Sequence, residues 1–149
     1  MVTVLLFSAA LLARSHDHLA SLEPGFEPEG VWTAQLSLDD ARFGAPEAMD
    51  RLFTRTLDEL RTMPGVTNAA VALSLPYERP LNMPFRLPTD EEDARPRLAN
   101  FVYVTPAFFE TLGIPIRDGR SFDLTDRADT QPVAVVSEGL AATHLSDVS

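Results

Sequence analysis

The chain has 149 residues, carries a formal net charge of −10 and contains no cysteine. This length suits one domain with a hydrophobic core, which would bury roughly 70% of the surface of the unfolded chain. The acidic balance argues against non-specific binding to nucleic acid, because contacts to phosphates need a basic face. The absence of cysteine excludes disulfides, thiolate metal ligands and cysteine nucleophiles.

Residues 1–13 are uncharged and almost wholly apolar. A helix that crosses the hydrocarbon core needs about 20 such residues, and no Lys or Arg precedes this run as it would in a signal peptide. We therefore expect residues 1–15 to be the C-terminal part of a transmembrane helix; a weak signal sequence and a buried soluble helix are the alternatives. Residues 16–30 are expected to form a juxtamembrane linker, because their last eight residues include two Pro and two Gly.

The folded part is predicted to begin with a strand over residues 31–38, whose alternating pattern places Trp32 toward the core. Apolar residues then recur every three or four positions over residues 46–63, which predicts an amphipathic helix that Pro64 and Gly65 end. A second strand is predicted over residues 66–76. Strand, helix and strand together form a βαβ-like unit.

Residues 77–97 contain four Pro and an acidic run. We expect a mobile excursion here, with an edge strand over residues 83–87. A third strand is predicted over residues 98–105, where β-branched and aromatic residues are frequent.

A short helix is predicted next, with Thr105 as its N-cap and Pro106 as its first residue. Phe108, Phe109 and Leu112 form its apolar face, and Gly113 ends it. A short strand over residues 114–117 and a turn at Asp118-Gly119 follow.

The last predicted elements are a strand over residues 133–136 and a helix with Ser137 as N-cap. The order of elements predicts an α+β fold: a layered domain with two βαβ-like units and helices on one face of a mixed sheet.

Two groups of polar residues resemble parts of metal sites. His16 and His18 would lie on one side of a strand, but a zinc site needs three or four protein ligands and no third is nearby. The carboxylates of Asp118, Asp123, Asp126 and Asp129 lack the spacing of a calcium-binding EF-hand loop. The sequence contains no phosphate-binding loop, nucleophile elbow or HExxH motif. We therefore expect no enzyme and no catalytic, cofactor-binding or metal-binding residue.

Five segments occur in an order that resembles a known family. They are LLARSHDHLASLEPGFEPEGVWTAQLSL, LRTMPGV, ALSLP, VYVTPAFFETLGIPIRDGRSF and PVAVVSEGLA. Together they resemble the MacB-like periplasmic core domain of permease subunits in MacB/FtsX-type ABC transporters, in particular the duplicated permeases of acidobacteria. The resemblance runs from about Leu11 to Leu145, and the fourth segment is the most specific.

The resemblance implies a protein of the bacterial inner membrane, anchored by its N-terminal helix, with residues after about 15 in the periplasm. Its core domain, residues 31–149, would couple the motion of a cytoplasmic ATPase to periplasmic events in export or efflux, without catalysis of its own. The implied partners are an ABC ATPase subunit and a second permease or a second copy. The residues implied to be architectural are Trp32, Pro64, Gly65, Thr105, Pro106, Phe108, Phe109, Leu112, Gly113, Gly119, Arg120 and Phe122.

The chain also departs from the family. It lacks the further transmembrane helices of such permeases, and it reads differently from them after Leu145. A fragment, a decayed gene copy and a clipped chain are therefore open explanations. A free-standing soluble periplasmic binding or interaction module, with an apolar groove near Phe85, Phe108 and Phe109, is the alternative function. The transported substrate is not encoded in any recognisable motif.

Overall fold

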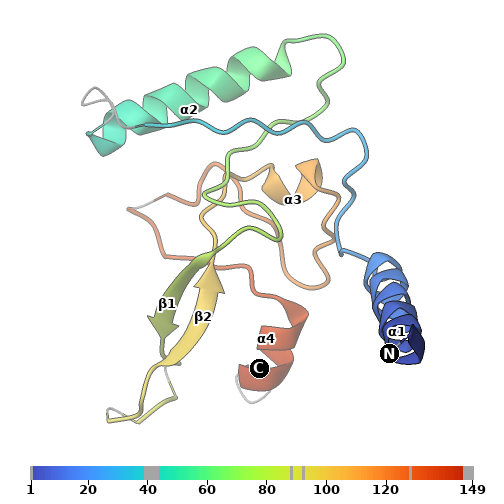
Figure 1. Cartoon of the computed structure of the whole chain (residues 1–149). Helices are drawn as coiled ribbons and strands as arrows, with labels where there is room; N and C mark the ends of the chain where they lie inside the picture. Colours follow the sequence, from blue (N-terminus) through green and yellow to red (C-terminus); the bar gives the residue numbers. More distant parts are fainter. Residues whose placement is uncertain (1, 39–43, 88, 92, 128, 146–149) are drawn as a thin grey trace.

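The structure is a computed structural model, and it describes residues 2–38, 44–87, 89–91, 93–127 and 129–145. The chain is mixed α/β, and within these residues it forms four helices and one small antiparallel sheet of two strands (Figure 1). The departure from the family after Leu145 lies outside the described residues. The elements are α1 (Val2–Ala20), α2 (Pro46–Arg61), β1 (Leu81–Phe85), β2 (Arg97–Phe101), α3 (Phe108–Thr111) and α4 (Glu138–His144).

Helix α1 stands apart from the other elements (Figure 1). Residues 2–19 are all exposed, including Leu6 at 66% and Phe7 at 67%. The helix does not end near residue 15 as expected, but continues through the polar residues to Ala20. Among the described residues, no helix has both the length and the apolar character that a membrane crossing requires.

Helix α2 confirms the amphipathic helix predicted over residues 46–63, although it ends two residues earlier. Pro46 is its first residue, and Leu57 is its buried residue. Gly65 follows with a φ of 88°, a left-handed conformation that suits glycine. The other face of α2 carries ion pairs between its own residues, such as that of Arg55 with Glu59 at 2.8 Å.

The sheet is a hairpin in which β1 pairs with β2, and Met83 lies opposite Ala99. The predicted edge strand is thus present, and its partner is the first part of the strand predicted over residues 98–105. An ion pair between Asp90 and Arg97 ties the connection to the base of β2. The Arg97 guanidinium and the backbone N–H of Leu87 both stabilise the Asp90 carboxylate and lower its pKa.

The predicted second strand is reduced to a single bridge between Ala72 and Val104. Two backbone hydrogen bonds flank it: Leu73 N–H donates to Tyr103 C=O at 2.9 Å, and Thr105 N–H donates to Val71 C=O at 2.9 Å. The βαβ units are therefore not formed as predicted. A strand pattern describes a side-chain surface, but a strand exists only where a neighbour completes the ladder of hydrogen bonds.

The segments 31–38, 114–117 and 133–136 are also not strands, contrary to the prediction. Trp32 is 96% exposed, so the expectation that it faces the core was wrong. Its neighbours Val31 and Thr33 point inward instead. The predicted alternation of buried and exposed residues is not present, because residues 32–37 are all exposed.

The core is small. Its buried apolar residues are Leu57, Ala69, Phe108 and Leu112. The chain exposes 12905 Å², whereas a compact monomer of this length exposes roughly 7,500 Å². The expectation of a domain that buries most of its surface is therefore not met, and much apolar surface remains available for contact with something else.

Candidate functional site

Helix α3 is the centre around which the remaining segments gather (Figure 1). Phe108 is buried and meets Phe109 edge-on, with ring centroids 5.5 Å apart. Phe109 in turn meets Phe122 at 5.9 Å. The structure thus joins three of the residues singled out in the sequence into one aromatic cluster, a role in packing that each can fill without polar chemistry.

Thr105 does not cap α3 as predicted, because the helix begins three residues later and Ala107 is its N-cap residue. Pro106 lies in the preceding turn, in which the Thr105 C=O accepts a hydrogen bond from Phe108 N–H. The Thr105 hydroxyl accepts from Val71 N–H at 2.9 Å and lies 3.3 Å from Val71 C=O, to which it donates. Its side chain therefore holds two chain segments together.

The C-terminus of α3 is closed by Gly113, as predicted. Gly113 has a φ of 61°, and Ile114 N–H donates to Phe109 C=O at 2.8 Å. This is a Schellman arrangement, for which glycine is the favoured residue. A Cβ at Gly113 would lie 2.9 Å from the side chain of Glu27, so glycine also lets the linker approach the helix end.

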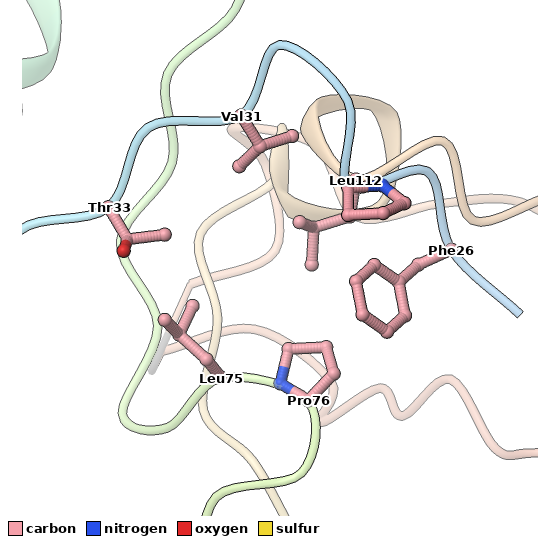
Figure 2. A pocket seen from close by; sticks show the side chains of 7 residues that line it. Phe26, Val31, Thr33, Leu75, Pro76 and Leu112 are labelled. Atoms are coloured by element: carbon pink, nitrogen blue, oxygen red, sulfur yellow. The ribbon is translucent and has the colours of Figure 1, made fainter. Parts of the chain in front are cut away.

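The linker crosses α3 and forms one side of an open cavity of about 170 Å³ (Figure 2). Glu27 N–H donates to Leu112 C=O at 2.8 Å, which fixes the crossing. The side chains that point toward the cavity in Figure 2 are those of Phe26, Val31, Thr33, Leu75, Pro76 and Leu112. The lining contains no charged residue, so the cavity suits an apolar group.

Tyr77 lies at the edge of this cavity, next to Pro76. Among the described residues, Tyr77 is the one non-glycine residue with a positive φ, which is 69°. Its ring is 85% exposed and meets the ring of Phe26 at 5.8 Å. A bulky residue in the left-handed region is unusual and costs on the order of 1–3 kcal/mol, so the backbone at Tyr77 is strained while its side chain stays exposed.

Arg120 organises the loop after α3. Its guanidinium binds both carboxylate oxygens of Asp126, each at 2.7 Å. The Arg120 guanidinium and the backbone N–H of Asp123 lower the pKa of Asp126 to about 2, and Asp126 in turn raises the pKa of Arg120. Hydrogen bonds from Thr125 lower the pKa of Asp123. Asp123 and Asp126 thus hold the shape of this loop.

Acid should therefore loosen this loop. A carboxyl whose pKa falls from near 3.9 in the unfolded chain to about 2 in the folded chain stabilises the fold fully above about pH 5, and this contribution is lost progressively as the pH falls through 2. We expect Asp126→Asn to be less stable than the natural chain at pH 7, and we expect the difference to shrink as the pH falls below 4 and to be smallest below pH 2, as measured by urea unfolding. The exposed Asp129, replaced by Asn, is the control; an equal effect of the two substitutions would contradict this role of Arg120.

The remaining residues singled out in the sequence lie apart from the cavity. Pro64 and Gly65 are exposed after α2, and Gly119 lies in an exposed turn with a φ of 76°. His16 and His18 are on α1, where two positions turn the side chains by about 200°, so they do not face one side as they would in a strand. The described residues hold no group of three or more metal-ligating side chains.

The groove expected near Phe85, Phe108 and Phe109 does not match the cavity, because none of these residues lines it. Phe85 instead meets His144 of α4, edge-on at 5.7 Å. Sequence reasoning missed the linker residues Phe26 and Glu27, since Pro and Gly marked this region only as a linker. Phe26 was the available signal: an aromatic residue within an otherwise polar linker needs something to pack against.

Comparisons with known proteins found no match: no family model, no curated protein and no solved structure is similar to this chain.

Proposed function

We propose that this chain is the periplasmic core domain of an ABC transporter permease of the MacB/FtsX type, held at the inner membrane by α1. The family assignment is supported by the five ordered segments that resemble that domain. The exposed apolar part of α1 is the observation that supports membrane attachment.

Ten of the twelve residues 2–13 of α1 are apolar, and all twelve are exposed, so the helix presents apolar side chains on all sides. A water-soluble surface helix normally buries one apolar stripe and keeps a polar face. These twelve positions extend over about 18 Å, a little more than half of a hydrocarbon core of about 30 Å. In our proposal they lie in the bilayer as the periplasmic end of a membrane helix, and the polar residues from Arg14 onward leave it.

The layered sheet is also part of the proposal. Leu73 N–H and Val71 C=O face the segment near Tyr103. Because backbone groups alternate in direction along an extended segment, those of Ala70 and Ala72 face the other way, where they have no hydrogen bond to any residue described in the structure. Residues 31–38 are the proposed strand for this open edge in the assembled permease.

The proposed role is mechanical coupling between an ATPase in the cytoplasm and export or efflux in the periplasm. The aromatic cluster of Phe108, Phe109 and Phe122 and the Arg120–Asp126 pair support it, because they stiffen the region that would transmit motion. The proposed partners are an ABC ATPase subunit and a permease partner or a second copy.

Fractionation of bacterial cells that express the full chain tests membrane attachment and orientation together. We expect the protein in the inner-membrane fraction, and we expect protease added to spheroplasts to degrade the residues after α1. A cytosolic protein in the same spheroplasts, which should stay intact, is the control. Protection of the domain until the inner membrane is lysed would place it in the cytosol and refute the proposal.

A further inference from the structure

The cavity beside α3 has an acidic rim. Glu27 packs over Gly113 at the end of α3, and its N–H is bonded to the C=O of Leu112, which lines the cavity. The Glu78 carboxylate accepts a hydrogen bond at 2.8 Å from the N–H of Leu75, another lining residue. The Glu78 carboxylate is thus held beside the lining residue Leu75, and the Glu27 side chain lies over Gly113, next to the lining residue Leu112.

These carboxylates are not neutralised by ion pairs. Neither Glu27 nor Glu78 has a salt bridge to any residue that the structure describes. Glu23 and Glu29 add negative charge on the linker, and the sequence has no Lys, Arg or His between His18 and Arg42. Arg79 follows Glu78 directly and is the basic residue nearest to this rim in the sequence.

The size of the cavity indicates what kind of group can occupy it. Pockets for metabolites and drug-sized ligands are usually about 300–1,000 Å³, so a cavity of about 170 Å³ is too small for most of them. A cavity of roughly 150 Å³ holds a molecule the size of benzene. One leucine or phenylalanine side chain from a partner would therefore fill it.

The surroundings of the cavity also favour a partner. The backbone of Tyr77 is strained, and its exposed side chain stands next to the lining residue Phe26, where a partner chain would cover it. Strain of this kind gathers at sites that bind ligands. The negative rim disfavours anionic lipid headgroups, which would be repelled.

We propose that this cavity and its rim, formed by Glu27 and Glu78, bind a protein segment that presents one apolar anchor side chain flanked by Arg or Lys. The anchor enters between Phe26, Leu75 and Leu112, and the basic groups pair with the two carboxylates. This inference goes beyond the proposed transport role, and it does not depend on where the protein is located.

Synthetic peptides test the proposal on the full chain in a nonionic detergent. The probe is acetyl-Gly-Arg-Leu-Leu-Arg-Gly-amide. One control peptide carries Glu in place of both Arg, and the other carries Ser in place of both Leu. Isothermal titration calorimetry measures the affinity of each peptide, because Trp32 is 96% exposed and does not line the cavity.

We expect the basic apolar peptide to bind at least fivefold more tightly than either control. The double variant Glu27→Gln/Glu78→Gln should lower its affinity about fivefold, the size expected from two ion pairs near the surface. Glutamine at position 78 keeps an acceptor for Leu75 N–H, so the turn is preserved. The matched control is Glu91→Gln/Glu138→Gln, which removes the same charge elsewhere and should leave the affinity unchanged.

Three results would overturn the proposal. They are no binding of the basic peptide, equal binding of the acidic peptide, and equal affinities in the two double variants. Sedimentation velocity can give a fourth such result. If the natural chain forms dimers and the Glu27→Gln/Glu78→Gln variant does not, the occupant of the cavity is a second copy of the chain. Membrane fractionation is measured separately, so failure of this proposal and failure of the proposed function are distinguishable.

Discussion

Replacing Leu112 with alanine should lower the free energy of unfolding by about 3 kcal/mol, within the range seen when a buried leucine is truncated. Leu112 is 5% exposed, lines the cavity and is bonded through its N–H to the C=O of the buried Phe108. The substitution would enlarge an existing void that the surrounding segments do not fill. Since domains are typically stable by only 5–15 kcal/mol, this loss is severe.

Leu124→Ala is the matched control, because Leu124 is 77% exposed in a loop and its truncation should change the stability by less than about 0.5 kcal/mol. Urea unfolding followed by circular dichroism measures both variants. Trp32 fluorescence is unsuitable here, because an indole that is already 96% exposed changes its environment little on unfolding. Equal midpoints for the two variants would show that α3 is not the centre of the core.

Two arginines in α1 should remove the protein from membranes. Leu6→Arg/Ala10→Arg places two charges within the apolar part of α1, and each charge near the centre of a bilayer costs about 2.5–3.5 kcal/mol. Together they should lower the membrane-bound fraction at least a hundredfold. The measurement is the distribution of the chain between the membrane pellet and the supernatant after an alkaline wash.

Leu22→Arg/Leu36→Arg adds the same charge outside that segment, at positions 54% and 60% exposed, and should leave the distribution unchanged. Neither double variant should shift the urea midpoint of the remaining fold, because α1 residues 2–19 are exposed and bury nothing against it. Retention of the Leu6/Ala10 variant in the pellet to the same extent as the natural chain would show that these residues do not enter the bilayer.

The peptide-binding and membrane proposals concern two different surfaces of one chain. Residues 2–13 of α1 are apolar and uncharged, whereas the cavity beside α3 is apolar with a negative rim. The hydrophobic effect is non-directional, so any apolar surroundings can cover an uncharged apolar surface. The apolar part of α1 therefore suits a bilayer. Charges add specificity to an apolar contact, so the cavity suits a particular protein segment.

The amino-acid sequence by itself determined the elements that depend on neighbouring residues. The helix over Pro46–Arg61, the cap at Ser137 and the left-handed Gly113 follow from local spacing and local backbone chemistry, and the structure contains each of them. Such features need only residues three or four positions away. The edge strand near Met83 was also predictable, because its pairing partner is close in the chain.

Only the tertiary structure decided which extended segments pair and which way they face. Trp32 points outward and Val31 inward because the linker crosses α3, a contact between residues far apart in the chain that no local pattern encodes. Thr105 binds Val71 rather than capping α3 for the same reason. The cavity and its rim likewise exist only because residues 26–33, 75–78 and 112 meet in space. Bringing such distant segments together costs chain entropy, which the packing between them offsets and which no local preference does.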